Sequence, residues 1–150
     1  MAAFSKTKPL DFVFGLGDQA FDAEGRVISL LFRDVIVVGT YNPQGGFTTE
    51  SLAEKVAWEK QLGIFLSKLR VRSGWEGRPV VWGGDLNVNP TRDDWTFKAW
   101  EHVRHKLKDQ IPAGCRDIDI QSYTNNVAAI DGATYATNFP HSPASYLFCE

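Results

Sequence analysis

The amino-acid sequence predicts an α/β fold, and three observations support this prediction. Four short runs, at 9–14, 27–32, 35–41 and 79–82, are apolar and β-branched-rich enough to form strands. Residues 51–72 instead carry apolar side chains three and four positions apart, which is the period of an amphipathic helix. The chain has 150 residues, of which 43% are hydrophobic and 23% charged, so it is long enough to fold as one domain around a buried core.

The first half of the chain begins with strands joined by short connections. The strand at 9–14 is followed by a loop at 15–25 that is rich in glycine and aspartate. Only Arg33 and Asp34 separate the next two strands, so these strands are expected to pair as a hairpin. Residues 42–46 contain a proline and two glycines and therefore predict a loop, because proline lacks a strand's amide donor and Gly-Gly breaks both kinds of element.

A long helix is predicted between this loop and the last of the four strands. Ser51 followed by Glu54 is a capping-box pattern, which predicts that the helix begins near Ser51. The apolar positions of the helix form one stripe, and a stripe buried in the core is favoured over an aromatic platform for stacking. The stripe comprises Trp58, Leu62, Phe65, Leu66 and Leu69.

The second half of the chain gives fewer signals. A second amphipathic helix is expected at 93–109, and the Pro-Ala-Gly sequence at 112–114 is expected to end it. Short strands are expected at 118–120 and 134–137. No element is predicted for 138–150.

The overall charge and the cysteines restrict the class of protein. The net charge is −2, so there is no general basic field, and a role in binding DNA would need a local basic patch. No apolar run is long enough to span a bilayer, and the start lacks the pattern of a secretory signal. Cys115 and Cys149 fit neither a disulfide framework nor a zinc motif. We therefore expect an intracellular protein with no membrane partner, in the nucleus if the source is a eukaryote.

Residues 79–88 carry the most informative motif. A short apolar strand runs into two glycines and then into the pair Asp85 and Asn87. The glycines are expected to turn the chain sharply, since they lack a Cβ. Alternate residues of an extended chain point the same way, so a carboxylate and a carboxamide are expected to share one face. Such oxygen ligands suit Mg²⁺ or Mn²⁺, whereas an Asx-rich turn after a strand is the alternative interpretation.

Several segments, in one order and at matching spacing, resemble exonuclease III-type abasic-site (AP) endonucleases of the endonuclease/exonuclease/phosphatase superfamily. Residues 84–87 resemble the G-D-x-N signature, and 39–46 (GTYNPQGG) resemble the T-Y-x-P-N-x-G strand end of that branch. Residues 15–18 and 22–28 follow the same branch in order. The resemblance is clearest over 4–110. It implies a four-layer α/β sandwich with two sheets face to face, of which this chain forms a part.

The resemblance implies roles for five residues. Asp85 would activate the attacking water or bind the metal, and Asn87 would stabilise the phosphorane-like transition state. The phenol of Tyr41 would point at the scissile phosphate. Arg26 and Gln44 would contact the DNA backbone, although Gln44 stands where the family usually has asparagine.

Structural interpretations remain open for several of these positions. Tyr41 is alternatively a cross-strand aromatic residue on a sheet face, and Arg26 is alternatively paired with Glu24 or Asp22 at the surface. Two histidines in the predicted second helix lie three apart without a third ligand nearby, so they are interpreted as part of a solvated face: His102 and His105. His141 follows a proline rather than the aspartate that precedes the family's catalytic histidine, and it receives no role.

The resemblance also implies that some catalytic segments are missing. The family's first strand, with an asparagine, and its first helix, with a metal-binding glutamate, would precede residue 1. Its late aspartate and its Asp-His pair have no equivalent in 115–150. We therefore expect a single truncated domain over 1–150, with a rate lowered by orders of magnitude. We also expect an incomplete sandwich that associates with a protein partner or with itself.

The sequence as a whole predicts a DNA-repair phosphodiesterase that hydrolyses the backbone of double-stranded DNA 5′ to abasic sites with Mg²⁺ or Mn²⁺. The first alternative is a non-catalytic remnant of such an enzyme that binds DNA or a protein. A further alternative is another phosphoesterase of the superfamily, such as a sphingomyelinase or an inositol-phosphate phosphatase. Residues 24–26 and 41–46 argue against this further alternative, because they resemble the DNA-repair branch.

Overall fold

A computed structural model describes residues 1–46, 48–89, 114, 116–130, 133–136 and 145–149. Among these residues, six strands form one mixed sheet in the order β1-β2-β3-β4-β6-β5. The strands are β1 (Asp11–Phe14), β2 (Val27–Leu31), β3 (Ile36–Tyr41), β4 (Val80–Asp85), β5 (Ala133–Ala136) and β6 (Ser145–Cys149). The helices are the single-turn α1 (Gln19–Asp22) and the longer α2 (Thr49–Leu69) and α4 (Asp117–Ala128).

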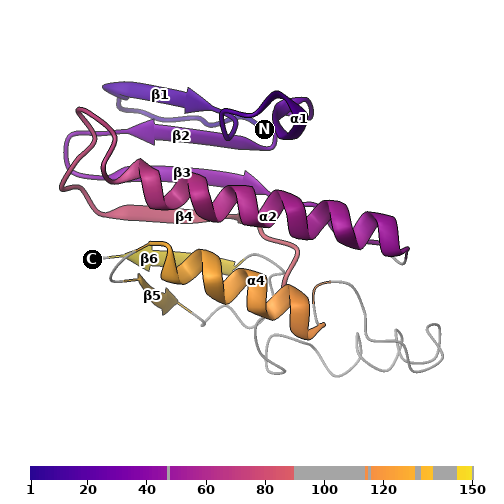
Figure 1. Ribbon diagram of the computed structural model, residues 1–150. Coiled ribbons are helices and arrows are strands. Elements are labelled where there is room, and N and C mark those ends of the chain that lie inside the picture. Colours follow the sequence, from indigo (N-terminus) through magenta and orange to yellow (C-terminus); the bar gives the residue numbers. More distant parts are fainter. Residues whose placement is uncertain (47, 90–113, 115, 131–132, 137–144, 150) are drawn as a thin grey trace.

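The sheet changes from antiparallel to parallel pairing at its centre (Figure 1). Strands β1, β2 and β3 form an antiparallel meander, which confirms the predicted hairpin between the second and third strands. Helix α2 then crosses over the sheet and returns the chain to β4, parallel to β3. Because β3 and β4 run in the same direction, their C-terminal ends meet at one edge of the sheet, where α/β proteins commonly bind ligands.

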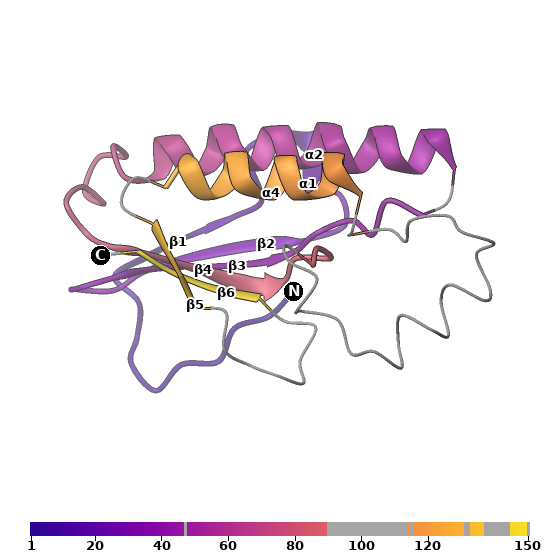
Figure 2. The ribbon, with the colours of Figure 1, turned by 90° about the horizontal axis from the view of Figure 1, so that it is seen from below.

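Helices α2 and α4 both lie on one face of the sheet (Figure 2). Alternate residues of β3 and β4 point into this layer, and four of them are at most 1% exposed: Ile36, Val38, Val80 and Trp82. The stripe predicted for the long helix joins the same core, with Phe65 half-buried and its other four members buried. Burial of one such side chain stabilises the fold by about 1.5–3 kcal/mol. The stripe is therefore a core stripe, as predicted.

The opposite face of the sheet carries no helix within the described ranges (Figure 2). Phe12 and Phe14 of β1 are 55% and 67% exposed, and their ring centroids lie 5.1 Å apart. Met1 reaches this face, because its sulfur lies 3.2 Å from the point that a Cβ of Gly39 would occupy. One sheet with helices on a single side corresponds to half of a four-layer sandwich, which agrees with the predicted partial α/β sandwich.

The start of the long helix differs from the prediction. Helix α2 is capped by Thr48, whose Oγ1 accepts a hydrogen bond of 3.1 Å from the Ser51 amide. The capping box at Ser51 is therefore wrong, because the true cap lies three residues earlier and Ser51 occupies the first turn. Neither α2 nor any other helix of the described segments is long and apolar enough to cross a membrane.

The strand predicted at 118–120 is also wrong, since these residues lie in α4. Three alternating residues are too few to distinguish a strand from a helix, and Asp119 acts instead at the helix start. Its Oδ2 accepts hydrogen bonds from the amides of Gly114 and Arg116, at 3.0 and 3.2 Å. The strand predicted at 134–137 is confirmed as β5, shifted by one residue. The helix predicted at 93–109 and the three histidines lie outside the described residues.

Candidate active site

The parallel pairing of β3 and β4 brings Tyr41 and Asp85 together at the edge of the sheet. The register pairs these two residues as the last rung of the two strands. Both side chains are accessible, and Tyr41 is 48% exposed. The Asn42 amide extends the pairing by one step, with a hydrogen bond of 2.8 Å to the Asp85 carbonyl. A phenol and a carboxylate are thus presented side by side on two rigid central strands.

The glycines before Asp85 continue the strand, so the predicted sharp turn at this point is wrong. Gly84 pairs with Thr40, and a Cβ on Gly84 would lie only 2.1 Å from the Thr40 carbonyl oxygen. Its φ of +135° is also one that side-chain-bearing residues rarely adopt. Glycine is therefore required here for close approach of two backbones. On the covered face, the Trp82 indole donates a buried hydrogen bond of 2.9 Å to Thr40 Oγ1 and holds the same two strands together.

Asn87 reaches the site by a different geometry from the one predicted. The strand ends at Asp85, and Asn87 has a left-handed φ of +48°, so the two residues do not alternate along an extended chain. Instead, Asp85 Oδ1 accepts the Asn87 amide at 3.1 Å, which closes an Asx turn. The Asn87 side-chain nitrogen donates to the Asn42 carbonyl at 2.7 Å. The turn, rather than the strand, keeps Asn87 beside Asp85.

Arg26 adjoins the site through Tyr41. Its guanidinium lies over the Tyr41 ring, 5.0 Å from the centroid, and donates to the Tyr41 carbonyl at 3.0 Å. Arg26 also forms an ion pair with Glu24. It is therefore both paired at the surface and in contact with a site residue. Gln44 is exposed on the loop that follows β3. Of the predicted site residues, Tyr41, Asp85, Asn87 and Arg26 are thus joined by these contacts, while Gln44 stands apart on the loop.

Comparison with known proteins places this geometry in a family. No protein-family model matches the chain. An exodeoxyribonuclease of Bacillus subtilis is 37% identical over 87 residues, which cover 58% of this chain and 32% of that protein. The DNA repair nuclease APEX1 of Danio rerio is 34% identical over 146 residues, which cover 92% of this chain and 46% of that protein. The chain belongs to the exonuclease III-type branch of the endonuclease/exonuclease/phosphatase superfamily.

A solved structure shows the same fold. The 3′-5′ exonuclease of Neisseria meningitidis superposes with a TM-score of 0.73 at 20% identity, over 97% of this chain and 60% of that one. The chain spans less than half the length of the Bacillus subtilis and Danio rerio relatives. Its fold corresponds to a part of the solved exonuclease.

The donor atoms at the strand ends are of the kind that a hard divalent cation takes. Asp85 is exposed, and its Oδ2 has no hydrogen-bond partner among the described residues. Asn87 keeps its side-chain oxygen available, because its nitrogen makes the bond to Asn42. Mg²⁺ commonly takes one or two carboxylates and completes its shell with water and substrate phosphate. Across the described parts of the chain, no three His, Cys, Asp or Glu side chains gather at one place.

Sequence reasoning missed a group of four charged residues beneath the site. Lys55, Glu59, Asp119 and Arg116, here called the buried charge cluster, link α2 to α4. Lys55 and Asp119 are 0% exposed and Glu59 is 2% exposed. Burial raises the pKa of Glu59, against the opposing effect of the Lys55 ammonium. A lysine and a glutamate at i and i+4 resemble a surface pair, so the sequence signal was misleading.

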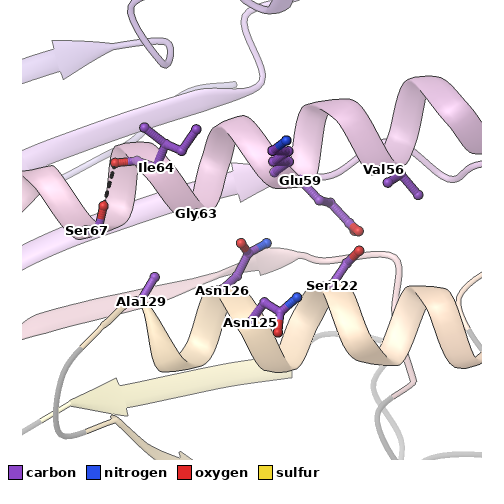
Figure 3. Close-up of a pocket in the computed structure, with 10 residues that line it drawn as sticks. Val56, Glu59, Gly63, Ile64, Ser67, Ser122, Asn125, Asn126 and Ala129 are labelled. Carbon is purple, nitrogen blue, oxygen red and sulfur yellow. Dashed lines mark hydrogen bonds between the residues drawn. The ribbon is translucent and has the colours of Figure 1, made fainter.

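A groove of about 480 Å³ opens between α2 and α4, away from the strand ends (Figure 3). Gly63 and Ile64 line it from α2, and Ser122 and Asn125 line it from α4. The Glu59 carboxylate extends across this gap toward α4 (Figure 3). None of the candidate site residues lines the groove, so the groove is distinct from the strand-end site.

Proposed function

We propose that this protein is a DNA-repair nuclease that hydrolyses the backbone of double-stranded DNA 5′ to abasic sites with Mg²⁺ or Mn²⁺. The observation that carries the proposal is the adjacency of Tyr41 and Asp85 at the ends of two parallel strands, with Asn87 turned in beside them. The names of the relatives support it, because they include AP endonucleases and an exodeoxyribonuclease. The fold of a 3′-5′ exonuclease agrees with the same class of chemistry.

Phosphodiester hydrolysis needs a positioned nucleophile and groups that offset the negative charge on the phosphate oxygens. In this proposal, Asp85 orients the attacking water through its free oxygen. The Tyr41 phenol and the second amide hydrogen of Asn87 donate to the phosphate oxygens. When bound, Mg²⁺ supplies Lewis-acid stabilisation of the same charge. Asp85 and Asn87 are the residues proposed to hold it.

DNA binding would rest on local positive charge, because the net charge of the chain is −2. Arg26 supplies a guanidinium beside Tyr41, and Gln44 offers an amide on the adjacent loop. Arginine suits this role because its planar fork binds phosphate through two hydrogen bonds. Substitution of Arg26 by methionine should weaken DNA binding equally for all sequences and reduce its salt dependence.

A non-catalytic protein that binds DNA or another protein is the second candidate. It is favoured by the small number of carboxylates, since the described residues hold no cluster of three potential metal ligands. It is also favoured by the exposed phenylalanines of β1, which offer an apolar surface for a protein partner or for self-association. Sedimentation across a concentration series, with Phe14→Ser as the comparison, measures this association. If both proteins stay monomeric at every concentration, the open face does not mediate self-association.

The test is incision of a labelled duplex that contains one abasic-site analogue. The reaction is run with Mg²⁺, with Mn²⁺ and with EDTA, and an intact duplex of the same sequence is the control. The proposal predicts a metal-dependent cut 5′ to the lesion and no cut in the intact duplex. A folded protein that binds both duplexes equally and cuts neither would support the non-catalytic candidate instead.

A further inference from the structure

The buried charge cluster lies directly beneath the two loops that carry the candidate site. The Lys55 ammonium donates to the Asn87 carbonyl at 2.8 Å. It also lies 3.3 Å from Glu59 Oε1 and 3.7 Å from Asp119 Oδ1. The contact with the Asn87 carbonyl is a hydrogen bond, and the two contacts with carboxylate oxygens are ion pairs. One of the three belongs to the loop that holds a candidate catalytic residue.

The other half of the cluster reaches the second loop. Arg116 Nε donates to Asp119 Oδ2 at 2.7 Å, and Arg116 Nη2 donates to the Gly45 carbonyl at 3.2 Å. Gly45 directly follows Gln44, the candidate DNA contact. Asp119 therefore connects a lysine under one site loop with an arginine under the other.

Hydrogen bonds support the conformation of Asn87. A left-handed φ of +48° is less favourable than right-handed backbone for most residues with a side chain, and asparagine adopts it where local hydrogen bonds stabilise it. Three hydrogen bonds do so: one from its amide, one from its side chain and one to its carbonyl. The first two involve the site itself, and of the three bonds only the one from Lys55 comes from helix α2. Leu86 and Val88, on either side of Asn87, are buried in the core, so packing holds the turn as a whole while Lys55 fixes the Asn87 carbonyl.

Stability alone does not explain a charged cluster at this place. Taking charges out of water carries a desolvation penalty that often cancels the attraction between them, so an apolar set of similar volume would hold α2 and α4 together as well. An apolar set could not, however, donate hydrogen bonds to the carbonyls of Asn87 and Gly45. The charged cluster can therefore donate hydrogen bonds to both loops, which an apolar core cannot do.

We propose that Lys55 and Arg116 are positioning residues for the strand-end site. Lys55 sets the place of Asn87, which acts in the transition state, and Arg116 sets the place of the Gln44 loop, which contacts substrate. The inference rests on the proposed nuclease function. It implies that loss of the two residues affects different kinetic constants, because misplacing a transition-state donor lowers kcat whereas misplacing a binding contact raises KM.

The test compares incision kinetics on the abasic duplex for three variants. Lys55→Met/Glu59→Gln removes the ammonium and the charge that it balances, and we expect kcat to fall about 10- to 100-fold with little change in KM. Arg116→Met is expected to raise KM about tenfold with little change in kcat. Lys60→Met, an exposed lysine of the same helix, is the matched control and should keep both constants.

Amide hydrogen exchange over residues 85–89 provides a readout that does not depend on activity. Faster exchange is expected in Lys55→Met/Glu59→Gln than in Lys60→Met. If the double variant does not fold, Arg116→Met alone tests the inference, because the inference predicts that this variant raises KM and leaves kcat unchanged. The inference would be overturned if the folded Lys55→Met/Glu59→Gln variant kept the kcat and KM of the wild type. It would also be overturned if this variant and Arg116→Met each changed kcat and KM to the same extent. No incision by the unsubstituted protein would overturn the proposed function itself.

Discussion

Neighbouring valines on the two central strands have opposite environments. Val38 and Val80 are each 1% exposed beneath the helices, whereas Val37 and Val81, one residue away, are only half-buried on the open face. The residue types are identical, so the difference comes from what covers each face. On the covered face, two helices exclude water, while the open face has no described helix. Among the described residues, the sheet therefore buries its side chains mainly on the side of the helices.

The difference also separates stability from function along the same strands. The covered face ends in Thr40 and Trp82, which bond to each other in the core. The last residues of the strands, Tyr41 and Asp85, are exposed. A strand alternates its side chains, so the residue that follows a core position is presented to the other side. Substitutions on the two sides should consequently change different measurements.

The largest difference in stability is expected between Val38→Ala and Val37→Ala. Removing two methyl groups from the covered position should lower the free energy of unfolding by about 2 kcal/mol, because apolar contact is lost and a cavity remains. The same change one residue earlier should lower it by less than about 1 kcal/mol. Urea denaturation of both variants measures the pair. Equal losses would mean that the open face is covered to the same degree.

A somewhat smaller loss of stability is expected from Thr40→Val. The substitution keeps the shape of the side chain but removes the acceptor of the Trp82 indole, whose N–H is then buried without a partner. Such a group costs about 1–3 kcal/mol. Thr124→Val is the control, since that hydroxyl only bonds back to the Ile120 carbonyl of its own exposed helix surface. The assignment would be contradicted if thermal unfolding showed that Thr124→Val is less stable than Thr40→Val.

The smallest effect is expected in the pH dependence of stability and involves Glu59. Burial raises the pKa of this carboxyl above its ordinary value of 4.5, so the folded chain holds the proton to higher pH than the unfolded chain does. The stabilisation is complete below the unfolded pKa and is lost as pH rises through the folded pKa. Glu59→Gln cannot titrate and should show a smaller decline in the free energy of unfolding over this window.

Glu54→Gln is the matched control for the pH experiment, because Glu54 is exposed on the same helix. Urea denaturation at several pH values measures all three proteins. If the wild type and Glu59→Gln decline in parallel, then Glu59 is not the group responsible.

The elements with a clear period could be predicted from the sequence. The hairpin of β2 and β3 and the core stripe of α2 follow from local alternation and helical spacing, and these were confirmed. The predicted start of α2 was wrong because both Thr48 and Ser51 are good capping residues, and only the fold decides between them. The predicted strand at 118–120 was wrong because three alternating residues fit a helix as well as a strand, and the Asp119 carboxylate caps the start of α4 through the amides of Gly114 and Arg116.

The site shows the same division between local and long-range information. Asp85 and Tyr41 were recognisable from motifs at two strand ends, but their pairing depends on a parallel register set by a helix crossover. The role of Gly84 depends on its closeness to Thr40, more than forty residues earlier in the chain. The buried charge cluster was missed because Lys55 and Asp119 meet only when α2 packs against α4.

The most direct test of the central claim is to measure incision and thermal unfolding together for Asp85→Ala. Asp34→Ala is the control, because it removes an exposed aspartate from the hairpin that precedes β3, the strand that pairs with β4. The account predicts that Asp85→Ala lowers incision of the abasic duplex by about 10³-fold while its melting temperature stays within about 2 °C of the wild type. Incision at the wild-type rate by folded Asp85→Ala would contradict the claim that the strand-end site performs the reaction.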